Sequence, residues 1–347
     1  MKRFFVLFIA VLAVFTTVRA QDTTNLTGKL IQGTAGGAPL SADIPVRLEI
    51  FSPEGELRET YSAISDAEGT VVFESVPRYT DGSLYVLVAA WAGIEQSSLP
   101  VTLTESSQSL ELPLYETTTS LNDVVLYEGN LQVNFEQTNA VGVQMLLEIT
   151  YTNLGDKIVL ADPVTGAFTA ELPVGALAIA PEQVGGSALR FQPVDQIGEL
   201  AIPGIRDMQP LVPNWPNIMR VSFFVPYELG AVIDMRFPFS VNNIRIFVRQ
   251  DTVYVDGGEL FELSDETETS SGRVYQIYEQ TRPLKSGEPF KFSLVGQPTQ
   301  TVQKSSDQSS DDDSSSAMTI VLVVVFVALV VFVGLTVWLV QARKKTL

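Results

Sequence analysis

Short runs of alternating apolar and polar residues fill the chain from residue 26 to residue 298. In one of them, Val46, Leu48 and Ile50 share one side and polar residues take most of the other, which is the period of a half-buried strand. Further runs typical of strands lie at 84–90, 143–152, 221–225 and 244–249. Gly and Pro separate the runs at close intervals, and no helical pattern of useful length lies between them. The pattern predicts an all-β protein built of sandwiches.

A polar joint divides this region into two parts. The strand-like run that ends at Glu116 is followed by Thr117-Thr118-Thr119-Ser120, which has nothing to bury. We therefore expect two β-sandwich domains in tandem, at residues 26–116 and 121–298. No Ser/Gly linker divides the second part, so we expect it to be one elaborated sandwich rather than two small ones.

The apolar run near the N-terminus is typical of a secretory signal. Two basic residues precede the run 4–15, which is too short to span a bilayer comfortably. Val18 and Ala20 then stand at the −3 and −1 positions of a cut before Gln21. We expect residues 1–20 to be a cleaved signal peptide, and the alternative is an uncleaved signal anchor.

The C-terminal apolar run is long enough to cross a membrane. Residues 317–340 carry no charge over 24 positions, and a helix of that length is about 36 Å long, against an apolar layer of about 30 Å. Three aspartates precede the run at 311–313, and three basic residues follow it at 343–345. Basic residues stay on the cytoplasmic side. We expect a single-pass type I membrane protein with a transmembrane helix at 317–340, a cytoplasmic tail at 341–347 and extracytoplasmic domains.

The segment before this helix is expected to be a disordered linker. Residues 299–316 are rich in Ser and Asp, and from 305 onwards nothing apolar is available for a core. A flexible tether of about 20 residues has a root-mean-square span of about 25 Å. Such a tether holds the folded domains near the membrane surface.

Charge and composition narrow the class of partner and the compartment. The net charge of −18 argues against binding to nucleic-acid phosphates. Six of the basic residues lie in the signal and the tail, so the exported region carries 16 basic and 40 acidic residues, a net charge of −24. No Cys is present, and Asn25-Leu26-Thr27 is the sole N-x-[ST] match. The chain therefore relies on its cores rather than on disulfides, and a bacterial envelope protein is favoured.

The first domain carries short motifs in a family-like order. Residues 26–116 resemble a carboxypeptidase regulatory-like domain, which has a transthyretin-like, carbohydrate-binding-like fold. The matching segments are Leu26–Leu30, Gly37–Leu40, Pro45–Leu48, Ser65–Phe73, Val76-Pro77 and Leu84–Leu87. Two departures occur: Val71 stands where an aromatic is usual, and the turn 79–83 is longer than usual. The resemblance implies a non-catalytic module.

The second domain resembles, more loosely, a β domain that follows such modules in bacterial membrane-anchored proteins. Its matching segments are Tyr151–Asp156, Leu172–Ala176 and Val225–Tyr227. This resemblance implies no activity.

Candidate sites in the first domain have structural alternatives. Asp66 and Glu68 offer two carboxylates, but they lack the run of oxygen ligands of a calcium loop, so a turn closed by Asp66 and Gly69 is favoured. Tyr85 and Trp91 are aromatic candidates for a sugar platform. Both lie in or beside an expected strand, so core packing is favoured for each.

The composition leaves little catalytic chemistry. Without His and Cys, no Ser-His-Asp, Cys-His or Cys/His zinc mechanism exists. No Ser-x-x-Lys, GxGxxG or phosphate-loop motif occurs in the exported region, so we predict no catalytic residues, no metal and no cofactor. A pair of carboxylates among the 40 acidic residues remains the one route to an enzyme.

A Pro-rich loop at 210–220 is the most unusual segment and precedes an expected strand. Trp and Met are enriched at contact surfaces, so Trp215, Met219 and Leu211 are candidates for contact with a partner. The alternative, which we favour, is a connection whose Trp215 folds back on the sandwich.

Two functions from different classes follow. The favoured one is a non-catalytic, membrane-tethered protein that binds or scaffolds at the cell envelope, with an envelope protein complex as a partner. The alternative is a carboxylate-dependent hydrolase or a carbohydrate-binding protein that acts on envelope glycans.

Overall fold

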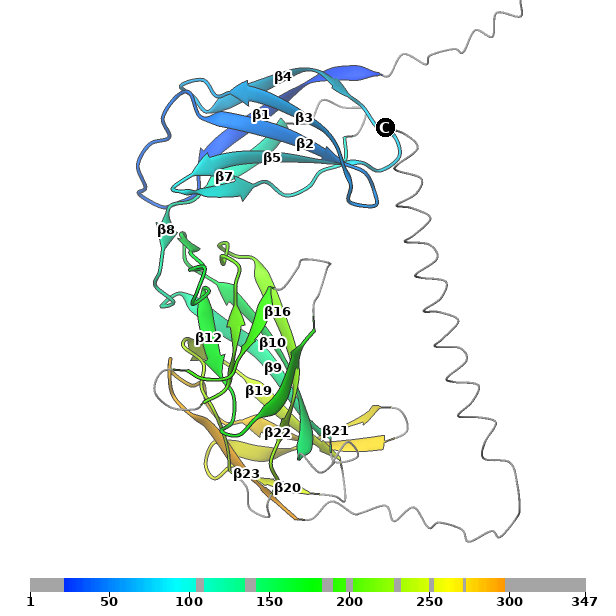
Figure 1. Ribbon diagram of the computed structural model, residues 1–347, viewed down its shortest axis with the longest axis vertical. Helices are drawn as coiled ribbons and strands as arrows, with labels where there is room; N and C mark the ends of the chain where they lie inside the picture. The colour runs from blue at the N-terminus through cyan, green and yellow to red at the C-terminus, as the bar shows by residue number, and fades with distance from the viewer. Residues whose placement is uncertain are drawn as a thin grey trace, which may run out of the picture. The chain divides into compact units, whose positions relative to one another are not determined.

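The computed structural model describes residues 22–103, 109–134, 142–182, 190–197, 202–227, 232–249, 253–270 and 273–296. Every regular element in these ranges is a strand, so the predicted all-β class is confirmed (Figure 1). They contain no helix that is long and apolar enough to cross a membrane. The predicted signal peptide (1–20), linker (299–316), transmembrane helix (317–340) and tail (341–347) lie outside the described residues.

The first part of the chain forms two sheets from seven strands. These are β1 (Thr23–Gln32), β2 (Pro45–Phe51), β3 (Leu57–Ile64), β4 (Thr70–Pro77), β5 (Leu84–Trp91), β6 (Ile94–Ser97) and β7 (Ser109–Leu114). One sheet has the order β4-β1-β7 and the other β3-β2-β5-β6. Strand β1 pairs antiparallel with β4 and parallel with β7.

A hydrophobic cluster draws on both of these sheets. Val46, Leu48 and Ile50 of β2 are at most 1% exposed, as their alternation predicts. They share the cluster with Leu26 of β1 and Leu112 of β7, which belong to the other sheet. The inward residues of the two sheets therefore make one core.

Strands β3 and β4 are joined by a turn that Asp66 closes. One carboxylate oxygen of Asp66 accepts hydrogen bonds from the backbone N–H groups of Glu68 (3.0 Å) and Thr70 (2.7 Å). Gly69 has a φ of +77°, in the left-handed region that favours glycine. The predicted turn is thus confirmed, and the Asp66 side chain is engaged in it.

The rest of the chain contributes sixteen strands. They are β8 (Thr117–Thr118), β9 (Val124–Asn134), β10 (Val143–Asn153), β11 (Ile158–Val159), β12 (Phe168–Glu171), β13 (Leu177–Pro181), β14 (Phe191–Val194), β15 (Gly204–Asp207), β16 (Pro216–Val225), β17 (Val232–Met235), β18 (Ser240–Val241), β19 (Ile244–Arg249), β20 (Tyr254–Asp256), β21 (Phe261–Ser270), β22 (Arg273–Gln280) and β23 (Phe290–Val295).

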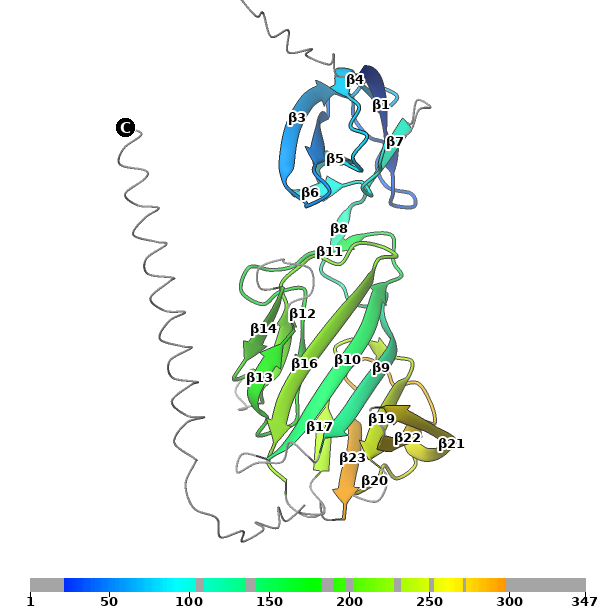
Figure 2. The same cartoon turned by 90° about the vertical axis from the view of Figure 1, so that its right-hand side faces the viewer.

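An eight-stranded sheet dominates this part. Its order is β13-β16-β10-β9-β19-β22-β21, with β18 paired to β9 off this path. The long strands β16, β10 and β9 run side by side (Figure 2). Two three-stranded sheets, β12-β15-β14 and β17-β23-β20, and the short pair β11-β8 complete the described strands.

One face of the large sheet is buried in a second hydrophobic cluster. Alternate residues of β10 and β16, such as Met145 and Phe223, point into it and are fully buried. Phe168 of β12 and Phe292 of β23 belong to the same cluster, so both three-stranded sheets contribute to it. The remaining side chains of β10 and β16 lie on the opposite face, which we call the outer face.

The two hydrophobic clusters share no residue. One contains buried residues between Leu26 and Leu114, and the other contains buried residues between Val124 and Leu294. The polar joint 117–120, at which the sequence predicts a boundary, lies between them.

Candidate functional site

A groove of about 520 Å³ crosses the outer face of the eight-stranded sheet. Six strands that are neighbours in the sheet supply its lining, from β13 through β16, β10, β9 and β19 to β22. Strand pairing explains how residues far apart in the sequence meet there, because side chains at paired positions stand on the same face. We call it the outer groove.

The register places the lining residues in two rows across the strands. In one row, Leu146 of β10 lies between Ser222 of β16 and Gln132 of β9, and Phe247 of β19 stands beside Gln132. In the other row, Glu148 of β10 lies between its partners, Arg220 of β16 and Asn130 of β9. The first row mixes apolar and amide groups, and the second is charged.

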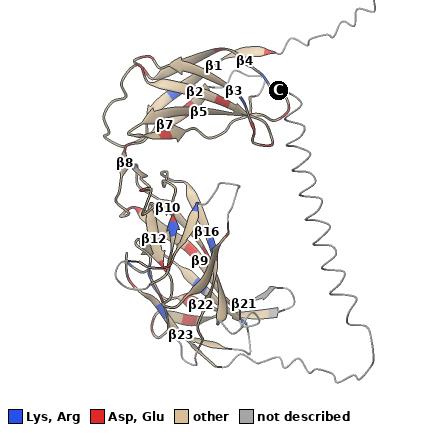
Figure 3. Ribbon diagram, viewed as in Figure 1, with Lys and Arg blue, Asp and Glu red and all other residues tan. Residues whose placement is uncertain are grey.

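The charges of the groove are paired within it. Nε of Arg220 donates a hydrogen bond to a carboxylate oxygen of Glu148, and Nη1 of Arg220 lies 3.8 Å from a carboxylate oxygen of Glu182. The hydrogen bond to Glu148 raises the pKa of Arg220. Beside the groove, Arg245 pairs with Glu128 at 2.7 Å. Basic and acidic segments lie close together in this region of β9, β10 and β16 (Figure 3).

The amide and aromatic groups of the groove are less fully engaged. Nε2 of Gln132 donates to the hydroxyl of Tyr275 at 3.3 Å. The Oδ1 atom of Asn130 is buried, and it has no hydrogen-bond partner within the described ranges. A buried acceptor without a donor costs about 1–3 kcal/mol.

A second arginine cluster lies on the buried side of the same strands, and we call it the inner cluster. Arg190 forms two hydrogen bonds with Asp207, at 3.0 and 2.7 Å, and a third with Oδ1 of Asn217 at 2.6 Å. The hydroxyl of Tyr151 donates to Asp207 as well. Burial, and then the negative charge of Asp207, raise the pKa of Tyr151 well above its usual value. Tyr151 and Asp207 are both 0% exposed, so these two groups are closed to a substrate, and Arg190 is the exposed member of the cluster, at 20%.

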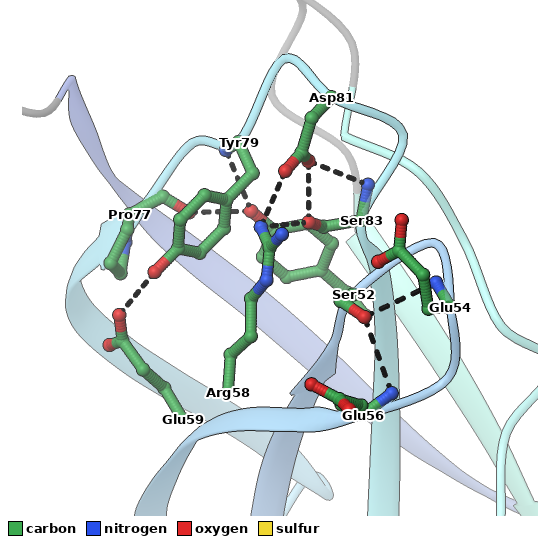
Figure 4. Close-up of polar contacts among 10 residues, drawn as sticks. Ser52, Glu54, Glu56, Arg58, Glu59, Pro77, Tyr79, Asp81 and Ser83 are labelled. Atoms are coloured by element: carbon green, nitrogen blue, oxygen red, sulfur yellow. Dashed lines mark hydrogen bonds and ion pairs between the residues drawn. The ribbon is translucent and has the colours of Figure 1, made fainter.

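A third arginine cluster lies at the edge of the first part of the chain (Figure 4). Nη1 of Arg58 contacts Asp81 at 2.6 Å and the hydroxyl of Ser83 at 2.8 Å. The guanidinium carbon of Arg58 lies 4.8 Å from the ring centre of Tyr79, whose hydroxyl donates to Glu59. Hydrogen bonds from Ser83 and Arg58 lower the pKa of Asp81 to about 2.

Two turns at this edge are each held by side-chain hydrogen bonds. Ser52 Oγ accepts from the backbone N–H groups of Glu54 (3.2 Å) and Glu56 (3.3 Å), which closes the turn before β3. Tyr85, which is fully buried, donates its hydroxyl hydrogen to the carbonyl of Pro77 at 2.6 Å. The turn 79–83, identified from the sequence as longer than usual, is thus held by side-chain bonds. We assign this cluster a structural role.

The predicted partner residues do not share one surface. Trp215 is 49% exposed, whereas Leu211 and Met219 are 0% exposed, so those two offer no surface to a partner in this structure. Met219 is an inward residue of β16, and Leu211 exchanges two backbone hydrogen bonds with Val159. For Trp215 a partner contact stays a prediction.

The other predicted candidates have these positions. Tyr85 is a core residue, as predicted, and Trp91 is half-buried against the first hydrophobic cluster. Among the described residues, no three or more Asp and Glu side chains are grouped to hold a metal ion. Sequence reasoning missed the groove residues, although the alternation in 143–152 and 221–225 already placed Glu148 and Ser222 on outward positions.

Comparison with known proteins adds no family. No protein-family model and no curated protein matches the chain. Among solved structures, a mutant of a two-domain M1 zinc metallopeptidase bound to L-tryptophan aligns at 10% identity and a TM-score of 0.29, over 53% of this chain and 44% of that one. The M1 zinc metallopeptidase from Deinococcus radiodurans aligns at 10% identity and a TM-score of 0.28, over 53% and 43%. The chain spans less than half the length of these proteins, and similarity at such TM-scores carries no argument.

Proposed function

We propose that this chain is a non-catalytic binding or scaffolding protein, tethered to the cell membrane and exposed outside the cytoplasm. In this proposal, two β-sandwich domains at 26–116 and 121–298 are joined by the linker 299–316 to a transmembrane helix at 317–340. The observation that carries the binding role is the outer groove, because a hollow across six strands brings amide, charged and aromatic side chains together.

The proposed tether is supported by the sequence of the C-terminal segment. An uncharged run of 24 residues with acidic residues before it and basic residues after it is typical of a single-pass helix with its C-terminus inside. The proposed signal peptide, 1–20, supplies the export that this orientation requires.

The proposed first domain is a carboxypeptidase regulatory-like module. The ordered motifs between residues 26 and 116 support it, and seven strands in two sheets with a common core are compatible with a sandwich of that kind. Such a module accounts for a display role and needs no catalytic group.

The arrangement of charges in the groove favours binding over hydrolysis. A glycosidase places the scissile bond between two carboxyl groups. In the groove, the guanidinium of Arg220 contacts both Glu148 and Glu182. Arg220 therefore occupies the position that a glycosidic bond would need, and the hydrolase alternative has less support.

The absence of Cys from the chain makes the orientation directly testable. Single cysteines are introduced as Thr165→Cys, at an exposed position of the second domain, and as Thr346→Cys in the tail. In intact cells a membrane-impermeant maleimide should label the first variant, and it should label the second only after permeabilisation. Labelling of Thr346→Cys in intact cells would contradict the proposed orientation.

The same approach tests binding at the groove. A benzophenone attached to Ser222→Cys should form a discrete cross-linked product in native envelopes, and the same group on Thr165→Cys, outside the groove, should not. The absence of any product from Ser222→Cys would contradict a binding role for the groove. Release of reducing sugar from envelope polysaccharide that is lost in Glu148→Gln would favour the hydrolase instead.

A further inference from the structure

We propose that the outer groove binds an uncharged oligosaccharide chain that runs across the strands of the sheet. This inference rests on the proposed role of the groove as the binding site, and it adds the chemical class of the ligand. It is carried by three properties of the lining: internally paired charges, amide side chains, and apolar surfaces between them.

The paired charges select against charged ligands. Arg220 is already bound by Glu148 and Glu182, and Arg245 beside the groove is bound by Glu128. An anionic ligand would have to break these pairs and approach a protein whose proposed exported region carries a net charge of −24 in total. A cationic ligand would compete with Arg220 for the same carboxylates. A neutral ligand leaves the pairs in place.

The amide groups match the hydroxyl groups of a sugar. Each hydroxyl is both a donor and an acceptor, and the side chains of Asn130 and Gln132 also present both kinds of group. Ser222, in the same row as Gln132, adds a hydroxyl on the other side of Leu146.

The apolar surfaces match the other side of a sugar ring. A pyranose has hydroxyls around its rim and C–H groups on its faces, so it packs well on aliphatic and aromatic side chains. Leu146, Phe247 and Tyr275 provide such surfaces among the polar groups, and Leu146 is 36% exposed. An alternation of apolar and amide groups is what a chain of sugar rings requires.

The dimensions of the groove fit a chain rather than a single sugar. Six neighbouring strands at a spacing of about 4.8 Å extend over about 24 Å. One strand spacing is close to the length of one hexose unit, so successive units meet successive strands. The volume of about 520 Å³ is within the range of about 300–1,000 Å³ for small-ligand sites.

An extended peptide fits the groove less well. Peptides that add to a sheet bind at an edge strand, where backbone N–H and C=O groups are free. The centre of the groove lies over β10 and β9, which pair with neighbours on both sides. The centre of the groove therefore offers side chains, and only its end at β13 reaches a terminal strand of the sheet.

The test is electrophoresis of the full chain through native gels that contain a polysaccharide, in a detergent without a sugar headgroup. The neutral probes are hydroxyethylcellulose, xylan, galactomannan and dextran, and the anionic probe is polygalacturonate. At least one neutral probe should retard the protein. Gln132→Ala and Tyr275→Ala should each weaken that retardation roughly tenfold, which corresponds to about 1.4 kcal/mol.

A matched control separates the groove from the rest of the surface. Tyr254 is 59% exposed on β20, outside the groove, so Tyr254→Ala should leave retardation unchanged. Thermal unfolding of each variant shows whether it folds, and Gln132→Ala provides the test if Tyr275→Ala does not.

Each outcome decides the inference. Failure of all four neutral probes, binding of polygalacturonate alone, or equal weakening by Tyr254→Ala would overturn it. A protein cross-linked to Ser222→Cys without any polysaccharide binding would overturn the sugar assignment and leave the binding role intact. If Ser222→Cys gives no cross-linked product and no polysaccharide binds, both the binding role of the groove and the sugar assignment are overturned.

Discussion

Two arginine clusters lie on opposite faces of β10 and β16, and they differ in their exposure to solvent. The cross-strand pair Glu148 and Arg220 belongs to the outer groove, and the pair Tyr151 and Asn217, three positions along each strand, belongs to the inner cluster. An odd separation along a strand reverses the face. The outer pair faces solvent, and the inner pair is buried.

The inner cluster is closed, whereas the groove is open. Asp207 accepts hydrogen bonds from Arg190, from Tyr151 and from the backbone N–H of Gln209. Its charge is therefore compensated inside the protein, and nothing remains for a ligand. In the groove, by contrast, the side chains of Arg220 and Glu148 are each 42% exposed. We therefore expect the inner cluster to stabilise the fold and the outer groove to bind a ligand, although both contain similar residue types.

Removal of Arg190 should have the largest effect. Arg190→Ala leaves the carboxylate of Asp207 buried without its cation, and an uncompensated buried charge typically costs about 3–5 kcal/mol. Urea unfolding of the full chain should show this loss. The matched change Arg220→Ala breaks an exposed pair that solvent screens, so it should cost much less than Arg190→Ala. Equal losses in the two variants would contradict the contrast between the clusters.

Tyr151→Phe should have the next largest effect and should change the response to alkaline pH. The lost hydrogen bond to Asp207 should cost about 1–2 kcal/mol. Because burial and Asp207 raise the pKa of Tyr151, the unfolded state loses its phenolic proton first, at about pH 10. The contribution of Tyr151 is thus fully present below pH 10 and is lost as the pH rises further.

Unfolding measured between about pH 8 and pH 11 checks this expectation. The wild-type chain should lose stability above about pH 10 more steeply than Tyr151→Phe does. Tyr254→Phe, at an exposed position, is the control and should follow the wild type. If the unfolding free energies of the wild type and Tyr151→Phe depend on pH in the same way, the inner cluster does not stabilise the protonated form of Tyr151.

Much of this arrangement was predictable from local patterns. The alternation around Val46, Met145 and Phe223 identifies strands and their inward residues, because the period of a strand is a local property. The same pattern, continued back from Phe223, puts Met219 on the inward side. Met219 was a candidate for partner contact because of its residue type, whereas the phase of the strand places it inward.

The clusters themselves were not predictable, because they depend on pairing between distant segments. Strand β19 lies parallel to β9 although more than a hundred residues separate them, and only this pairing brings Phe247 beside Gln132. Likewise, Arg190 meets Tyr151 through packing of separate sheets. Forty acidic residues and many arginines permit many pairs, and sequence alone selects none of them.

The stability that the edge cluster of Arg58 contributes should depend on acidic pH. Its charged groups are bonded to each other, as in the inner cluster, but they are exposed to solvent, as in the groove. Because Ser83 and Arg58 lower the pKa of Asp81 to about 2 from 3.8, the contribution of Asp81 is present above about pH 4 and is lost as the pH falls towards 2. The difference in unfolding free energy between wild type and Asp81→Asn should therefore shrink over that interval. A difference that stays constant from pH 7 to pH 2 would show that closure at the surface adds no stability.

Trp215→Ala should have the smallest effect on folding. Half of the Trp215 side chain faces solvent, and its removal leaves no buried charge or unpaired donor in the core, so the change should be within about 0.5 kcal/mol. Cross-linking from Ser222→Cys should persist in a Trp215→Ala background, because Trp215 is not among the residues that line the groove. Loss of the cross-linked product would show that the Pro-rich loop contributes to the binding surface. Persistence, together with unchanged stability, would confine recognition to the outer face of the sheet, where the polar groups remain open.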